Sequence, residues 1–346
     1  MSGRPIAYVM EQTLGNVTHY LNLRREEAVR HDFRLQWLPI DYRPSGLPWT
    51  VTGGLDTRRA LKHVLEQVDG IFIHTITLAP FVADYLRAKP TVLSCDGTPF
   101  NKREMRQAYG LKAEGPLAKH VKQALYRRVF AQAVGFVGWS AWAKQSLVED
   151  YGCREEDVVV IPPGVDLDTF QVGDRRHQLP RLLFVGGDFV RKGGDLLLEV
   201  FRQRLRGRAE LILVSNTDLH DEPGVTIYRD LPANSDTLRT LYATADIFVL
   251  PTRADCFSMV YLEALASGLP IVSTPVRGLS DLVREGETGF MVQVDDAKGL
   301  GDMVEALVND PAARQAMSDR CRVEAERQFD VRKNARRLFE FVRSRC

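Results

Sequence analysis

The sequence predicts an α/β protein of two similar domains, each with a parallel β-sheet covered by helices. Three observations lead to this prediction. The chain has 346 residues, whereas one domain usually takes roughly 100 to 200. Short apolar, β-branched runs alternate with amphipathic stretches, as expected for strands and helices around a parallel sheet. The alternation stops once, at a polar stretch, and then starts again.

Six apolar runs mark the strands of the first domain. They are PIAYVM, FRLQWLPI, GIFIHT, PTVLSC, GFVGWS and DVVVIPP. Their nearly continuous hydrophobicity suits strands that are covered on both faces. The polar stretch QVGDRRHQLP follows, with glycine and proline near its ends, and is typical of a linker. We therefore place the first domain at residues 1–175.

The second domain begins where the alternation restarts. Its predicted strands are RLLFVGG, ELILVSN, VTIYRD, DIFVLPT, PIVSTP and GFMVQV. We place this domain at residues 176–328. Residues 311–346 carry apolar side chains at helical spacing among many arginines, so the tail should be helical. Residues 329–346 form a separate C-terminal helix, whose return to the first domain is left open.

Charge and cysteine content narrow the class of protein. The chain has 46 Lys and Arg residues and 45 Asp and Glu residues, which gives a formal net charge of +1. This near-zero net charge does not indicate nucleic acid as a partner. The five cysteines are odd in number and form no C-x-x-C pair, which fits a reduced cytoplasm. Neither a signal-like start nor a membrane span of ~20 apolar residues is visible. We expect a cytoplasmic protein, soluble or peripheral to the inner face of the membrane.

The most informative segment is PTRADCFSMVYLEALASGLP. A predicted strand ends at Pro251, a loop carries Asp255, and a helix begins near Ser258. The first amides of a helix lack intrahelical partners and lie at the positive end of its dipole. We therefore expect the backbone of Ser258, Met259 and Val260 to hold an anionic diphosphate.

Side chains of the same segment suit the sugar parts of a nucleotide-sugar. Glu263 lies about one and a half turns into the helix, where its carboxylate can accept from two ribose hydroxyls. Asp255 would face the transferred sugar. Cys256 and Ser258, which are small, flank Phe257 and allow backbone amides to approach sugar hydroxyls.

The string D-C-F-S-M-V-Y-L-E-A-L-A-S-G-L-P resembles the signature of the family-4 retaining glycosyltransferases, E-G-F-G-x-x-x-x-E-A-x-A-x-G-x-P. Asp255 stands in place of the first Glu, which shortens that side chain by one methylene. The resemblance implies a GT-B fold, with two Rossmann-like domains facing across a central cleft and the donor held mainly by the second. It also implies a hexosyltransferase-type enzyme that needs no metal and no cofactor and uses a UDP- or GDP-linked sugar as substrate.

A second segment, RLLFVGGDFVRKGGDLLLEVF, places a glycine-rich turn between a strand and a helix. In the family this turn often carries an Arg directly after the first glycine and a Lys five residues later, both on the diphosphate. Lys192 matches the Lys, but Gly187 stands where the Arg is expected. Arg191 offers a guanidinium whose fork suits phosphate oxygens. The alternative is a solvated basic turn before a helix.

The first domain should supply the acceptor side. Gly15, in EQTLGNVTHYLNL, resembles the family's first glycine-rich loop, and His19 in the same stretch is either a helix-packing residue or a sugar contact. The family usually has a His after the fourth strand, in T-x-H-D, but here the residues are SCDGTP, with Asp96 in the His position. Asp96 is a candidate for contact with a sugar or acceptor, with turn capping as the alternative. His74 ends the preceding strand and is either a site residue or a buried histidine.

Three other features carry less weight. The D-x-D of VDLDTF has a metal-binding spacing but lies near the linker, so we expect no metal there. Residues 228–231, with Arg229, are candidates for the base pocket. The stretch GPLAKHVKQALYRRVFAQAV combines basic and apolar residues at helical spacing, so peripheral contact with an anionic membrane is an alternative. A surface helix with one core face is the favoured interpretation.

Together these features predict a retaining glycosyltransferase that moves a sugar from a nucleotide diphosphate-sugar to a hydroxyl of an acceptor sugar, lipid or small molecule. Two alternatives share the fold. One is a nucleotide-sugar 2-epimerase, and the other is a degenerate, nucleotide-binding regulatory or scaffold subunit. The base, the sugar and the acceptor are not identified by the sequence.

Overall fold

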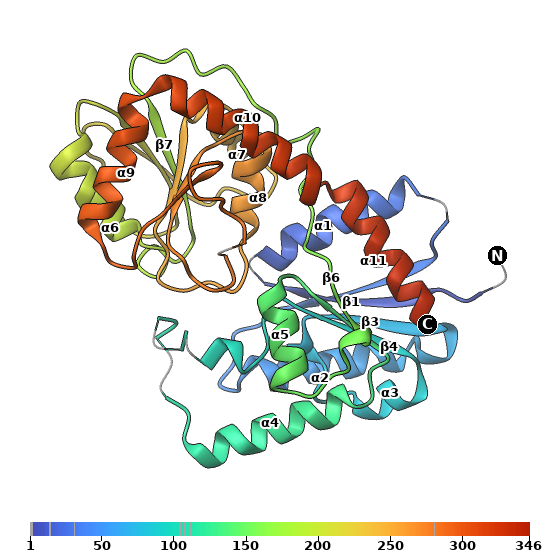
Figure 1. The fold of residues 1–346 in the computed structure, drawn as a ribbon. Helices are drawn as coiled ribbons and strands as arrows, with labels where there is room; N and C mark the ends of the chain where they lie inside the picture. Colours follow the sequence, from blue (N-terminus) through green and yellow to red (C-terminus); the bar gives the residue numbers. More distant parts are fainter. Residues whose placement is uncertain are drawn as a thin grey trace. The chain divides into compact units, whose positions relative to one another are not determined.

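A computed structural model describes residues 3–13, 15–30, 32–103, 105–106, 108–110, 113–279 and 281–346. The chain divides into two compact units (Figure 1). Unit 1 consists of Met1–Gly164 with Val331–Cys346, and unit 2 of Val165–Asp330. Each unit is described by itself.

Unit 1 is built on a six-stranded parallel sheet with the strand order β2-β1-β3-β4-β5-β6. The strands are β1 (Ile6–Gln12), β2 (Leu35–Asp41), β3 (Gly70–His74), β4 (Thr91–Cys95), β5 (Gly135–Gly138) and β6 (Val158–Val160). The helices are α1 (Gly15–Ala28), α2 (Trp49–Lys62), α3 (Ala83–Ala88), α4 (Pro116–Phe130), α5 (Ala141–Glu149) and α11 (Val331–Arg345).

Both faces of this sheet are buried, because its strands alternate between two hydrophobic cores. Ala7 and Val9 of β1 pack with residues of α2, α3, α4 and α5 on one face. Tyr8 and Met10 pack on the other face with residues of α1 and α11. Figure 1 shows α1 and α11 on the same side of this sheet. The two-residue period of a strand produces this division.

Unit 2 repeats the architecture with the strand order β12-β11-β10-β7-β8-β9, again all parallel. The strands are β7 (Arg181–Val185), β8 (Glu210–Val214), β9 (Val225–Tyr228), β10 (Ile247–Leu250), β11 (Ile271–Ser273) and β12 (Gly289–Met291). The helices are α6 (Gly194–Val200), α7 (Asp236–Thr244), α8 (Met259–Ala266), α9 (Ala297–Asn309) and α10 (Pro311–Gln328). The fold prediction of two parallel α/β sheets is confirmed, and each of the twelve predicted runs contains a strand.

The polar stretch expected to be a linker, residues 171–180, is attached to unit 2. The amide of Gly173 donates to Ala243 O at 3.2 Å. The Arg175 guanidinium donates to Gly268 O at 2.9 Å and to Ser318 Oγ at 3.1 Å. The chain therefore passes from unit 1 to unit 2 after Gly164, whereas the sequence places the division at residue 175.

The tail is helical, as predicted, and α11 belongs to unit 1. Within the described part of the chain, none of the helices combines the length and hydrophobicity needed to cross a bilayer.

Candidate donor and sugar site

The turn that follows β7 is held against the end of β10. Gly193 has a φ of 76°, in the left-handed region that favours glycine. A Cβ atom at this position would lie 2.0 Å from the carbonyl oxygen of Pro251. The turn and the end of β10 are therefore in backbone contact, and only glycine fits there. Gly187 is exposed, and a Cβ there would meet open space.

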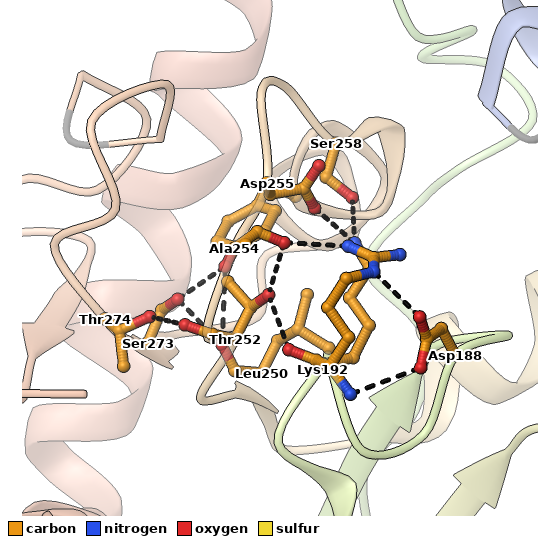
Figure 2. A network of polar contacts seen from close by, with 11 residues as sticks. Asp188, Lys192, Leu250, Thr252, Ala254, Asp255, Ser258, Ser273 and Thr274 are labelled. Atoms are coloured by element: carbon orange, nitrogen blue, oxygen red, sulfur yellow. Dashed lines mark hydrogen bonds and ion pairs between the residues drawn. The ribbon is translucent and has the colours of Figure 1, made fainter. Parts of the chain in front are cut away.

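Lys192 of this turn forms a buried ion pair with Asp255 (Figure 2). Its ammonium donates to Asp255 Oδ2 and to Ser258 Oγ, the latter at 3.1 Å. The side chains of Lys192 and Asp255 are 10% and 9% exposed. Breaking such a pair by removing one partner would leave an uncompensated charge, so the two residues depend on each other. The sequence assigned each of them separately to a ligand.

Arg191 ties the turn to the loop that precedes α8. Its Nε donates to Asp188 Oδ2 at 2.9 Å, and its Nη1 donates to Ala254 O at 2.7 Å. In the opposite direction, the amide of Arg253 donates to Arg191 O at 2.8 Å. Arg191 is 7% exposed. Its expected contact with phosphate stays a prediction, and the structure adds that it holds the loop.

The amino end of α8 carries a lysine ammonium, which is paired with the Asp255 carboxylate. Ser258 occupies the N-cap position, but its side chain makes no cap hydrogen bond to the helix. Its Oγ accepts from Lys192 instead, so a lysine ammonium lies beside the first turn, at the positive end of the helix dipole. This is the chemistry of an anion site. Met259 is buried and Val260 is partly exposed.

The residues before α8 are packed under the segment that follows β11. Cys256 and Phe257 are 2% and 8% exposed. A Cβ atom at Gly278 would lie 1.7 Å from the carbonyl oxygen of Cys256. The backbone at residues 256–258 is therefore fixed from two sides, by this segment and by Lys192.

Glu263 lies farther along α8 and is 4% exposed. Burial raises the pKa of its carboxyl to about 7, although a hydrogen bond with the Tyr242 side chain acts in the opposite direction. Its Oε2 is buried and has no hydrogen-bond partner in the protein. A buried acceptor without a donor is costly. A ribose hydroxyl is the kind of group that would satisfy this oxygen.

The candidate base-pocket residues lie after β9. The Arg229 side chain is exposed and donates to Leu219 O. The amide of Asp230 donates to Asn216 Oδ1 at 2.9 Å. The loops after β8 and β9 are therefore tied together.

In unit 1, His74 is part of a buried polar network. Its Nδ1 lies 3.1 Å from Ser94 Oγ, and its Nε2 lies 3.0 Å from Asn16 Oδ1. Because an amide oxygen only accepts, Nε2 carries the proton and Nδ1 accepts from the serine. The ring stacks on Trp139 at a centroid distance of 4.7 Å. Burial, with a smaller contribution from the Lys102 charge, lowers the pKa of His74 to about 3.

His19 belongs to the same group of rings. Its ring meets those of His74 and Trp139 edge-on, at 5.2 and 5.0 Å. Burial, and to a lesser degree His74, lowers its pKa well below the usual value. Its Nδ1 is buried without a hydrogen-bond partner, and the residue lines a cavity of about 10 Å³ together with Ser94, enough for about one water molecule.

Asp96 lies just beyond β4, on the sheet edge where β3 ends. His74 and Ser94 are paired across β3 and β4, so these positions share the carboxyl edge of the sheet. Lys102 Nζ forms an ion pair with Asp96 Oδ1 at 3.1 Å. Gly15 is the first residue of α1.

Sequence reasoning missed several members of the unit 1 network. Glu11 accepts from Thr13 Oγ1 at 2.7 Å and from Thr75 Oγ1, and Trp139 stacks on His74. The signal for Glu11 was present, because a charged residue ends an otherwise apolar strand. Nothing in the local sequence indicated Trp139.

The D-x-D spacing serves a turn. Asp166 accepts from the amide of Asp168 at 3.0 Å and from Thr169 Oγ1 at 2.6 Å, which is the local bonding of an Asx turn. Over the described residues, no group of three or more His, Cys, Asp or Glu side chains is placed to hold a metal ion.

Family models match both units of the chain. Residues 17–169 match the model described as Glycosyltransferase Family 4, and residues 179–310 match the model described as Glycosyl transferases group 1. One relative is D-inositol 3-phosphate glycosyltransferase 1 of Catenulispora acidiphila, 31% identical over 55% of this chain and 52% of its own length. Another is the D-inositol 3-phosphate glycosyltransferase of Nocardia farcinica, 30% identical over 57% of this chain and 50% of its own. The matches thus span about half the length of these curated relatives.

Solved structures of similar fold cover nearly the whole chain. Sucrose-phosphate synthase from Thermosynechococcus elongatus superposes with a TM-score of 0.78 at 18% identity, over 99% of this chain and 98% of that one. HepE from Anabaena, solved in complex with UDP-glucose, gives 0.75 at 16% identity, over 99% and 100%. These similarities establish the GT-B fold. The two family models match one unit each, and the chain therefore belongs to the family-4, group 1 glycosyltransferases.

Proposed function

We propose that the protein is a retaining, hexosyltransferase-type glycosyltransferase that moves a sugar from a UDP- or GDP-linked donor to an acceptor hydroxyl. One observation carries the proposal: Lys192, Asp255 and Ser258 meet at the amino end of α8, with Glu263 farther along the same helix. This arrangement offers an anion site beside an acceptor for ribose hydroxyls. The similarity to HepE, solved with UDP-glucose, supports a nucleotide-sugar donor.

The proposed mechanism gives each charged group a task. The donor diphosphate takes the place of Asp255 beside the Lys192 ammonium and accepts from the first amides of α8. Arg191 supports the same charge. Asp255, released from Lys192, accepts from hydroxyls of the sugar. The positive charge that the reaction needs then comes from the protein, and we propose that no metal is required.

The chemical step is a front-face displacement. The acceptor oxygen forms a bond to the anomeric carbon while the bond from that carbon to the β-phosphate oxygen breaks. The proton of the acceptor hydroxyl passes to the departing diphosphate, on the same face of the sugar. No enzyme nucleophile takes part, and the anomeric configuration is retained. Lys192 stabilises the charge that grows on the leaving group.

We assign the sugar or acceptor contacts of unit 1 to Asp96 and His74, with His19 behind them. His74 is neutral at physiological pH because its pKa is about 3, so its role is to orient through hydrogen bonds. The acceptor is a hydroxyl of a sugar, a lipid or a small molecule. None of the five cysteines, all within the described residues, forms a disulfide, which supports a reducing compartment such as the cytoplasm.

The first experiment is a thermal-shift screen over nucleoside diphosphates and their sugars. A bound nucleotide stabilises the protein by RT ln(1 + [L]/Kd), so the correct base should give the largest shift. The selected donor is then incubated with candidate acceptors, with and without EDTA, and the product is analysed by NMR.

Three outcomes of this experiment are distinct. A product with the donor's anomeric configuration, formed equally well in EDTA, supports the proposal. A 2-epimer that stays on the nucleotide would identify an epimerase. Binding of nucleotide without release of diphosphate, even by slow hydrolysis, would indicate a regulatory subunit.

A further inference from the structure

Helix α4 carries apolar side chains on two different sides. Its core side packs into unit 1 and consists of Tyr126, Val129 and Phe130. A second set is exposed: Leu117 by 77%, Val121 by 60% and Leu125 by 40%. Because these three are spaced by four residues, they form one stripe along the helix. The core side therefore accounts for only half of the six large apolar side chains of the helix.

The charged side chains of the helix itself have one sign. Between Gly115 and Gln132 the chain has four Lys or Arg residues and no Asp or Glu. Two of the four are engaged: Lys122 pairs with Glu114 at 3.0 Å, and Arg127 donates to Asp150 O at 2.8 Å. The whole protein has a formal charge of only +1, so this concentration of positive charge is local.

A groove next to the stripe adds a place for an anionic group. It has a volume of about 240 Å³ and is lined by Arg87 of α3 and by Leu125 and Arg128 of α4. Two guanidinium groups at the border of an apolar surface match a phosphate that is joined to hydrocarbon, because the guanidinium fork suits phosphate oxygens.

We propose that α4 docks the protein on an anionic lipid bilayer. The stripe of Leu117, Val121 and Leu125 enters the boundary between headgroups and acyl chains, as the apolar side of an interfacial helix does. Arg87 and Arg128 hold a lipid phosphate. A second copy of this chain is a poorer partner, because symmetric docking of this surface would bring like charges together. The inference is independent of the proposed reaction, since it uses no residue of the donor site.

The test uses the full chain and vesicles of two compositions, pure phosphatidylcholine and phosphatidylcholine mixed with phosphatidylglycerol. We expect flotation with the anionic vesicles only, weakening as salt is raised. Replacing the stripe, in the variant Leu117→Ser/Val121→Ser/Leu125→Ser, should reduce partitioning at least about tenfold. The variant Arg87→Gln/Arg128→Gln should lose about fivefold for each cation removed.

A matched control is Val323→Ser, because Val323 is 61% exposed on α10 in unit 2. It should bind vesicles like the unchanged protein. Thermal denaturation of each variant checks the fold, which should persist because the replaced stripe residues are exposed.

Two results would overturn the proposal. One is the failure of the unchanged protein to bind anionic vesicles, and the other is undiminished binding by the stripe variant. If the unchanged protein instead self-associates in solution and the stripe variant does not, the surface is a contact between protein copies, and the membrane assignment is wrong.

Discussion

The candidate site residues of the two units differ in the charge that they bury. In unit 2, Lys192 and Asp255 are buried as a charged pair beside a helix terminus. In unit 1, His74 and His19 are buried and neutral, with pKa values lowered mainly by burial. In the proposed mechanism, the first arrangement exchanges one anion for another, and the second orients groups through hydrogen bonds. The comparison teaches that similar folds can bury a charged pair in one unit and neutral imidazoles in the other.

The largest effect should come from Lys192→Ala. With the ammonium removed, nothing at that position stabilises the leaving diphosphate, and we expect turnover to fall about 100- to 1000-fold, with a smaller change in KM for the donor. Steady-state kinetics with the donor found by screening measures both constants. Lys298→Ala is the control, because the Lys298 side chain is 85% exposed and forms an ion pair with Asp302 on the same helix, α9.

Loss of Lys192 also leaves the Asp255 carboxylate buried alone, at a cost of about 3 kcal/mol. The double variant Lys192→Ala/Asp255→Ala separates the two effects. It should recover much of the stability but none of the turnover. If the double variant recovers activity together with stability, the Lys192 ammonium does not serve the leaving diphosphate, and the contrast drawn between the two units is wrong.

The next effect is on stability and depends on pH. The pKa of Glu263 is raised from 4.5 to about 7 by burial, so the folded protein holds this proton more tightly than the unfolded chain does. The associated stability is fully present below about pH 4.5 and is lost as pH rises to about 7. The Glu263→Gln variant keeps a neutral group at every pH. It should be more stable than the unchanged protein at pH 8, by up to about 3 kcal/mol.

Chemical denaturation at pH 8 and at pH 4.5 measures this difference. At the lower pH the two proteins should have nearly equal free energies of unfolding. An equal gap at both pH values would show that titration of Glu263 is not its source.

A smaller effect is expected on donor binding. Glu263→Ala removes the acceptor proposed for the ribose hydroxyls, so the Kd for the nucleotide should rise about tenfold while turnover at saturation changes little. Isothermal titration calorimetry measures the Kd. Glu199→Ala serves as the control, since Glu199 is an exposed residue of α6 that accepts from Gln203. A fall in turnover without a change in Kd would contradict the assignment.

The smallest effect is expected in unit 1, where we predict that the charge of the His74 side chain does not change with pH. Because the pKa of His74 is about 3, its imidazole should remain uncharged from pH 5 to pH 8. NMR of labelled histidine follows the ring through this range, and the His74→Gln variant identifies its signal. A chemical-shift midpoint inside the range would remove the contrast between the units.

The fold could be predicted well from the sequence, because buried parallel strands appear as nearly continuous apolar runs. The division between the units was harder to place. Residues 171–180 have the composition of a linker, yet Arg175 donates to groups near residues 268 and 318, and no local pattern reveals such distant partners.

The candidate site was predictable where its residues are contiguous and not where they are assembled. The segment from Asp255 to Glu263 forms one pattern on one loop and helix. The pairing of Lys192 with Asp255 joins residues that are 63 positions apart. From the sequence, each was therefore assigned to a ligand and not to the other. Helix α4 shows the same limit. Helical spacing identifies its apolar residues but does not tell which side the core covers.

The return of α11 to unit 1 has a consequence for the order of folding during synthesis. Ala335, Leu338, Phe339 and Val342 of this helix pack with Tyr8 and Phe72 in one of the two cores of unit 1. These residues follow all of unit 2 in the chain, so they leave the ribosome after it. The contiguous segment 165–330 can condense while the nascent chain is still attached, whereas the half made first waits for its final helix. A stop codon placed a few residues before α11 would therefore damage the amino-terminal half and spare the donor-binding one.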